Sequence, residues 1–208
     1  DKWSNDPILQ PGTDKDYWNN FHKNDGFDKG HLCASEDRVY MKEANWQTFY
    51  YSNMSPQFNS FNGGFWQKLE AKLQSWGRST ITGTYDNVYV TKGGTINELL
   101  TSYHAEKKGG DGKWPNTDEK GFTVGGIACP KYYFMAILCE KGEIYQAIAF
   151  LVEHREDLTS KPSNEEMQAC AISIDELEAK TGIDFFCNLP DGIEAEVEAS
   201  KNLNAWAW

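Results

Sequence analysis

The sequence predicts an α+β fold in which a central, mainly antiparallel sheet is flanked by helices. Residues 63–76 place apolar side chains at helical spacing, which predicts a helix with one buried face. Residues 131–139 and 144–153 are rich in Tyr, Phe, Ile and Val, and the residues 140–143 between them are typical of a turn. Two adjacent strands joined by a short turn form an antiparallel hairpin, which we expect at the centre of the sheet.

Both ends of the predicted helix carry a local signal. Asn62 is a favourable N-cap residue, and Gly77 is a favourable residue at a helix end. Ser173 and Glu176 have the spacing of a capping box, which predicts a second helix that ends at Gly182. Weaker patterns predict an extended coil at 1–27, strands at 39–41, 79–85 and 88–91, a loop at 107–121 and an acidic helix at 191–200.

The chain is expected to form a single domain over residues 1–208. Its 208 residues, 39% of them hydrophobic, suffice for one sizeable core. No internal repeat divides the sequence, and no apolar run approaches the ~20 residues that cross a bilayer. The N-terminal residues lack the charged-then-apolar pattern of a signal peptide. We therefore expect a soluble body without membrane association.

The net charge of −11 argues at first against a nucleic-acid partner, because proteins that bind polyanions usually present a basic face. The acidic excess is uneven, however. Residues 153–200 hold 13 acidic and 3 basic side chains, whereas residues 1–152 hold 18 acidic and 16 basic ones. The first three quarters are nearly neutral, so a phosphate site there is electrostatically feasible with the help of a divalent cation.

The five cysteines are Cys33, Cys129, Cys139, Cys170 and Cys187. No two of them have Cys-x-x-Cys spacing, which argues against a structural zinc. They allow at most two disulfides within the chain, and they could equally be small buried apolar residues. The count slightly favours one disulfide and leaves its pairing open.

His31 is the histidine whose setting best suits chemistry. It ends the polar turn Asp28–His31, and a histidine can take a proton near neutral pH. Asn62 and Glu70 lie about two helical turns, or ~12 Å, apart, so they share a face of the predicted helix. An amide oxygen suits a hard cation such as Mg²⁺, and a carboxylate can hold metal-bound water. Each residue alone also fits an ordinary structural role: a surface histidine, a helix cap and a solvated glutamate.

Four sequence blocks in order favour the chemical interpretation. They are Asp28-Lys29-Gly30-His31-Leu32, Ser52-Asn53-Met54-Ser55-Pro56-Gln57, Asn62 and Trp66-Gln67-Lys68-Leu69-Glu70. Together they resemble the signature of the DNA/RNA non-specific endonucleases, a family with the ββα-metal, or His-Me finger, nuclease fold. This family includes secreted bacterial nucleases and mitochondrial endonuclease G. The resemblance continues through residues 85–94, 130–138 and 173–190, and so covers most of the chain.

The resemblance implies a metal-dependent nuclease that cuts DNA and RNA phosphodiesters and leaves 5′-phosphate ends. His31 would activate the attacking water, and Asn62 would coordinate a single Mg²⁺, with Mn²⁺ as the alternative metal. Asn53 would help to position the site, and Glu70 would bind the water shell of the metal. The metal would stabilise charge on the phosphate and on the departing 3′ oxygen.

Two positions depart from the family pattern. Lys29 stands where the family usually has arginine, so the charge is kept but the planar fork that grips a phosphate is lost. Lys29 is then either a weaker phosphate clamp or a partner of a carboxylate such as Asp28. The family also uses an arginine upstream of the motif, whereas the first arginine here is Arg38. Lys2, Arg38 and Arg78 are all candidates for that role.

Two alternatives to an active nuclease stay open. One is a catalytically silent nuclease-like module that binds a protein or nucleic acid, because a fold does not guarantee activity. The other is a toxin nuclease that an immunity or inhibitor protein neutralises. The resemblance further favours DNA and RNA as substrates and a secreted or periplasmic location, and it leaves a homodimer open.

Overall fold

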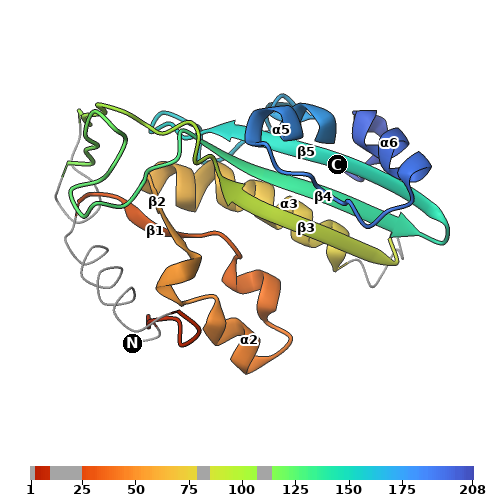
Figure 1. The fold of residues 1–208 in the computed structure, drawn as a ribbon, viewed down its shortest axis with the longest axis horizontal. Coiled ribbons are helices and arrows are strands. Elements are labelled where there is room, and N and C mark those ends of the chain that lie inside the picture. Colours follow the sequence, from red (N-terminus) through yellow and green to blue (C-terminus); the bar gives the residue numbers. More distant parts are fainter. Residues whose placement is uncertain (1–2, 10–24, 79–84, 107–113) are drawn as a thin grey trace.

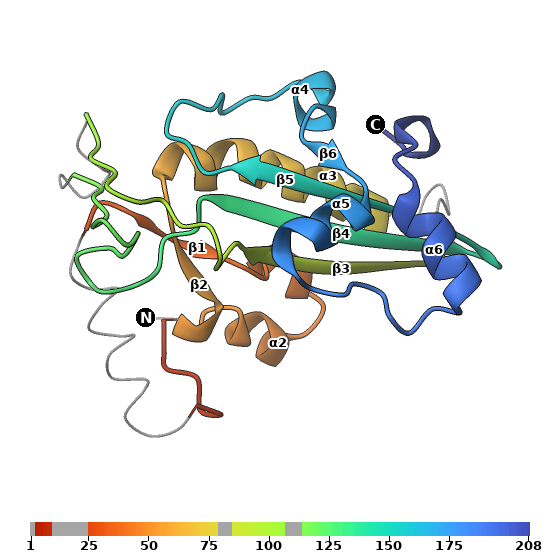
Figure 2. The same cartoon turned by 45° about the horizontal axis from the view of Figure 1, so that its top comes forward.

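The computed structural model describes residues 3–9, 25–78, 85–106 and 114–208. Within these ranges the centre of the fold is a four-stranded antiparallel sheet in the order β3-β4-β5-β6. One face of this sheet is covered by α3, and the other by α5 and α6 (Figure 1 and Figure 2). The predicted α+β architecture is confirmed. The strands are β3 (Asn87–Gly94), β4 (Tyr132–Lys141), β5 (Ile144–Glu153) and β6 (Ala171–Ile172). The helices are α3 (Gln67–Gly77), α5 (Ile174–Thr181) and α6 (Asp191–Ala199).

Strand β4 is buried on both faces, which explains its nearly continuous apolar sequence. One set of alternate residues packs on the side of α3: Tyr133, Met135, Ile137 and Cys139. The other set packs on the side of α5 and α6: Phe134, Ala136 and Leu138. Because side chains alternate along a strand, one element contributes to both layers of the core. The predicted β4–β5 hairpin is confirmed, with Tyr132 opposite Glu153 at its open end.

The helix predicted at 63–76 is present, but it begins earlier. A wide first turn, η3 (Phe61–Trp66), runs directly into α3, and its N-cap is Ser60. The backbone N–H of Asn62 already donates to the carbonyl of Phe58 at 2.8 Å, so Asn62 lies inside the first turn. The prediction of Asn62 as N-cap was therefore wrong, and its side-chain amide is used elsewhere.

A second, two-stranded sheet lies at the end of the main sheet that is far from α6 (Figure 1). Strand β1 (Asp28–His31) pairs antiparallel with β2 (Met54–Gln57), so the turn predicted at Asp28–His31 was wrong. Gly30 lies so close to β2 that an added Cβ would fall 2.1 Å from the side chain of Gln57. A larger residue at position 30 would therefore force the buried side chain of Gln57 to move.

The chain between β1 and β2 forms short helices rather than a strand. They are η1 (Ser35–Arg38), α2 (Lys42–Gln47) and η2 (Tyr51–Asn53). The strand predicted at 39–41 was wrong, because these residues form the turn between η1 and α2. Their side chains are exposed, and no strand among the described residues pairs with them. Strand-forming residues need a neighbouring strand, which this turn does not have.

All five cysteines are free, so the slight preference for one disulfide was wrong. Cys129 and Cys139 are fully buried and act as small apolar residues. Cys33 and Cys170 are half-buried, and Cys187 is exposed.

The two predicted C-terminal helices are confirmed. The Ser173 hydroxyl accepts from the N–H of Glu176 at 3.1 Å, the Ser173 N–H donates to the Glu176 carboxylate at 2.8 Å, and α5 ends at Gly182 with a φ of 71°. A similar box at Ser163 opens α4 (Asn164–Gln168), and η4 (Leu203–Ala205) follows α6.

The remaining predictions fall partly outside the described residues. The strand predicted at 88–91 lies within β3 and is confirmed. Most of the predicted coil at 1–27 and strand at 79–85, and half of the loop at 107–121, are not among the described residues. Among those that are, no helix is long and apolar enough to span a membrane.

Candidate active site

Strands β1 and β2 and helix α3 place the predicted site residues. Lys29 and His31 lie on β1, whose partner β2 leads within four residues into the wide turn that carries Asn62. Glu70 lies further along, in the first turn of α3. On a strand, alternate residues face the same side, so Lys29 and His31 share one face of β1.

His31 is held in an aromatic setting. Its ring centroid lies 5.5 Å from that of Trp3 and 5.1 Å from that of Phe49. Burial lowers the pKa of His31 below its usual 6.5, and the positive charge of Lys92 lowers it further. Its Nε2 is buried and has no hydrogen-bond partner among the described residues. His31 is therefore neutral near pH 7, and one ring nitrogen is left for a group outside the protein.

Lys29 extends over the same aromatic residue, with its Nζ 5.4 Å from the centroid of the Trp3 ring. Lys29 forms no ion pair within the described part of the chain, so the pairing with Asp28 that the sequence left open is not observed there. Asp28 points away from Lys29, as neighbouring residues on a strand do.

The side-chain amide of Asn62 donates a hydrogen bond to Asp28 and does not cap a helix. Its Nδ2 donates to Oδ2 of Asp28 at 3.2 Å, and Nδ2 of Asn59 donates to the same oxygen at 3.0 Å. This arrangement uses the amide nitrogen of Asn62 and leaves its amide oxygen beside a carboxylate. Neutral and charged oxygens are the ligands that a hard cation such as Mg²⁺ prefers, so the donor set around Asn62 fits one.

Glu70 lies in a buried ion-pair cluster that the sequence did not predict. Nζ of Lys92 lies 3.0 Å from Oε1 of Glu70 and also bonds to Asp37, and the lysine side chain is only 6% exposed. Gln74 donates to the other oxygen of Asp37 at 2.9 Å. Burial alone would lower the pKa of Lys92, but the two carboxylates outweigh it and raise the pKa. Lys92 is therefore a fixed positive charge that orients Glu70 and acts on His31.

Asn53 is fully engaged with the backbone. Its Oδ1 accepts from the N–H of Cys33 at 2.9 Å, and its Nδ2 donates to the carbonyls of Cys33 and Thr48 at 2.8 and 2.9 Å. Since both ends of the amide bond to the backbone, Asn53 holds in place the chain just after His31.

His154 is a further residue that the sequence analysis missed. It is 1% exposed, its Nε2 accepts from the N–H of Phe58 at 2.9 Å, and its Nδ1 lies 3.1 Å from the carbonyl of Pro130. Burial lowers its pKa to about 3. A neutral His154 therefore ties the end of β5 to the segment that enters η3, four residues before Asn62.

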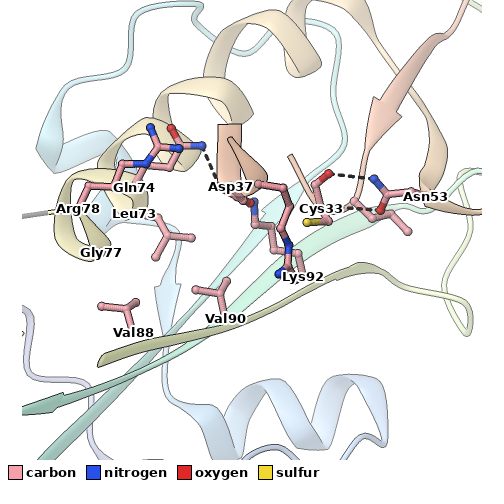
Figure 3. Close-up of a pocket in the computed structure, with 12 residues that line it drawn as sticks. Cys33, Asp37, Asn53, Leu73, Gln74, Gly77, Arg78, Val88, Val90 and Lys92 are labelled. Atoms are coloured by element: carbon pink, nitrogen blue, oxygen red, sulfur yellow. Dashed lines mark hydrogen bonds and ion pairs between the residues drawn. The ribbon is translucent and has the colours of Figure 1, made fainter. Parts of the chain in front are cut away.

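A cavity of about 600 Å³ opens beside the Lys92 cluster (Figure 3). Its lining includes three basic side chains, Arg38, Arg78 and Lys92, together with Asp37. Arg78 also forms an exposed ion pair with Glu36 at 3.5 Å. Two of the three candidates for the missing upstream arginine thus line this cavity, whereas Lys2 lies outside the described residues.

The structure therefore gathers the predicted residues into two neighbouring groups. Asn62 lies with Asp28, and Glu70 lies with Lys92, whose charge reaches His31. No hydrogen bond or ion pair joins His31, Asn62 and Glu70 directly in the part of the chain that is described. Lys92 and His154 were missed because their partners come from distant segments. The sequence signal for Lys92 was a charged residue after the uncharged stretch 88–91, and that for His154 was a histidine at the end of an apolar strand.

A histidine on the first of two paired strands, followed by a helix with an asparagine in its first turn, defines the ββα-metal nuclease class of fold. A chain in the crystal structure of the EndoG/EndoGI complex, a study of EndoG inhibition, has this fold and matches with a TM-score of 0.65 at 22% identity. The match covers 91% of this chain and 72% of that one. The chain belongs to the DNA/RNA non-specific endonuclease family, whose model matches residues 1–192.

Curated relatives carry nuclease names. Nuclease C1 of Cunninghamella echinulata var. echinulata is 31% identical over 88% of this chain and 64% of the relative. The mitochondrial Nuclease 1 of Schizosaccharomyces pombe is 29% identical over 82% of this chain and 49% of the relative. The chain thus spans about half to two thirds of the length of these relatives.

Proposed function

We propose that the protein is a metal-dependent endonuclease that hydrolyses DNA and RNA phosphodiesters with little sequence preference and leaves 5′-phosphate ends. Membership of the endonuclease family and the nuclease names of the relatives support this activity. The structural observation that carries the proposal is the buried, unpartnered Nε2 of His31. A neutral imidazole nitrogen without a protein partner is what a general base for water requires.

Two features of the site keep His31 in that state. Burial and the charge of Lys92 both disfavour the imidazolium, so the base stays unprotonated at neutral pH. The rings of Trp3 and Phe49 restrict its orientation. The proton taken from water would reside on Nε2 and leave to solvent after the phosphodiester is cut.

Asn62 would hold the divalent metal through its amide oxygen, with Asp28 beside it, and we propose Mg²⁺, with Mn²⁺ as the alternative. When bound, the metal supplies a Lewis acid for the scissile phosphate and the leaving 3′ oxygen. Lys92 engages Oε1 of Glu70, so we assign Oε2 of that residue to metal-bound water. Asp28 orients Asn62 by accepting from its Nδ2.

Basic side chains around the site would hold the nucleic-acid backbone. Lys29 lies on the His31 face of β1, and Arg38 and Arg78 line the nearby cavity. With few such cations in a chain of net charge −11, we propose binding that weakens modestly with salt. We also propose a secreted or periplasmic location. Since all five cysteines are free, this location rests on the frequent export of the family and not on disulfides.

The decisive test is degradation of plasmid DNA and total RNA by the purified chain with Mg²⁺, with His31→Ala, and with EDTA. His104→Ala is the matched control, because His104 is exposed and stacks on Trp114, away from the site residues. We expect activity on both substrates that His31→Ala and EDTA abolish and His104→Ala leaves intact. Intact substrates with every metal tried would favour a silent binding module instead. A tightly bound inhibitor protein that copurifies from the source cell would favour the alternative of a toxin nuclease.

A further inference from the structure

Three carboxylates meet on the face of the main sheet that is opposite α3. Asp175 and Glu178 lie on α5, and Glu198 lies on the neighbouring helix α6 (Figure 2). One carboxylate oxygen from each lies within 4.8 Å of the others. Three like charges at this separation repel one another strongly unless a cation or a proton lies among them.

Glu198 differs from an ordinary surface acid. It is 7% exposed, and its Oε1 is buried and lacks a hydrogen-bond partner among the described residues. An unpaired buried carboxylate oxygen costs free energy, so a native fold that keeps one usually supplies a ligand for it. Because this oxygen belongs to the group that approaches Asp175 and Glu178, the missing ligand would lie between the two helices.

Among the residues that the structure describes, no protein cation takes that place. None of the ion pairs in the described part of the chain includes Asp175, Glu178 or Glu198, and Lys180 of α5 pairs instead with Glu98 at 2.5 Å. Glu178 is also held in position, because its Oε1 accepts from the backbone N–H of Phe185 at 2.7 Å. The three carboxylates therefore form an acidic, oxygen-only set of ligands, in which Glu198 is buried, Glu178 is half-buried and Asp175 is exposed.

We propose that Asp175, Glu178 and Glu198 bind a divalent cation, with calcium preferred to magnesium, and that this ion joins α5 to α6. Calcium accepts carboxylate ligands in irregular geometry, whereas magnesium demands a near-octahedral shell and gives up its water reluctantly. The site lies across the sheet from α3, so it is separate from the metal proposed at Asn62. Asp175 and Glu178 lie within the match to the family, but Glu198 lies beyond residue 192, where that match ends, so the match does not include the complete set of three ligands.

A proton is the competitor of this ion. Burial, together with the nearby charges of Glu178, Glu194, Asp175 and Asp184, raises the pKa of Glu198 to about 7. Below that pH Glu198 is neutral, so its repulsion with Asp175 and Glu178 is removed without any metal. The test is therefore made at about pH 8, where Glu198 is ionised and a cation has most to contribute.

The experiment is thermal unfolding of the full chain at about pH 8 in EDTA, CaCl₂ or MgCl₂, with Glu198→Gln as the variant. Glu196→Gln is the matched control, because Glu196 lies on the same helix and is exposed. At a calcium concentration 100 times the dissociation constant, we expect Tm of the wild type and of Glu196→Gln to rise by roughly 5–10 °C. We expect little rise in Glu198→Gln. In EDTA, Glu198→Gln should be at least as stable as the wild type, because the substitution removes repulsion.

Calcium binding measured by equilibrium dialysis gives an independent readout. The wild type should bind one more equivalent than Glu198→Gln, and nuclease activity in Mg²⁺ should be equal in the two proteins. An equal rise of Tm with calcium in both proteins, or no rise in the wild type, would overturn the proposed site. A larger response to magnesium would overturn the calcium preference.

Discussion

Replacement of His154 by glutamine tests how the site helix is held. His154 is fully buried among aromatic rings, and its Nε2 must stay unprotonated to accept from the N–H of Phe58. Glutamine keeps a hydrogen-bonding side chain of similar length but does not titrate. The variant therefore removes the proton equilibrium while the burial of the position stays similar.

The size of the effect follows from linkage. Burial lowers the pKa of His154 to about 3 from its usual 6.5. The unfolded chain then binds a proton that the folded chain does not, so the free energy of unfolding falls as pH drops below 6.5, and the loss continues to about pH 3. Between about pH 7.5 and about pH 5 this loss is about 2 kcal/mol, and over the whole interval it approaches about 5 kcal/mol.

Urea unfolding of both proteins at these two pH values measures the difference directly. We expect the wild type to lose about 2 kcal/mol more than His154→Gln, because all other titrating groups are common to both chains. Two parallel pH curves would refute the reasoning, since they would mean that folding does not lower the pKa of His154.

The lowered pKa of His31 should place the acidic limb of kcat/KM below pH 6.5, and a limb above that value would show that His31 is not the base. Asn62→Ala should raise the Mg²⁺ concentration for half-maximal activity about 10- to 100-fold, and Asp28→Asn should raise it less, because Asp28 acts through Asn62; unchanged metal titrations would contradict the assignment. Lys92→Met removes the cation that pairs with two partly buried carboxylates, Asp37 and Glu70, so urea unfolding should show a loss of about 3 kcal/mol. Arg78→Ala breaks only an exposed pair and should cost less than about 1 kcal/mol. Similar losses in these two variants would contradict the burial argument.

Local patterns were sufficient for most of the fold. The β4–β5 hairpin, the helix that ends at Gly77 and the capping box at Ser173 depend on neighbours in sequence, and all three were predictable. The strand at 39–41 was wrong because a strand depends on a partner that the pattern does not reveal. The start of the site helix was misplaced because Asn62 has a better use than capping, which is its bond to Asp28 on another element.

The candidate site likewise contains residues that the sequence could predict and residues that it could not. The motif at Asp28–His31 and the spacing of Asn62 and Glu70 are visible in the sequence, because a resemblance preserves order and spacing. Lys92 and His154 act on the site through partners 22 and 96 residues away, and only the fold brings them together. Without Lys92, Glu70 would be a buried lone carboxylate, so the environment of the motif is set by residues outside it.

The fold also resolves the conflict between a net charge of −11 and a polyanionic substrate. Helices α5 and α6 carry seven acidic residues and one basic residue, and both pack on the face of the sheet opposite α3. The candidate site and the basic residues of its cavity lie on the α3 side. A buried sheet therefore separates most of the repulsive charge from the phosphates, and a cation between α5 and α6 would reduce that charge where it is densest.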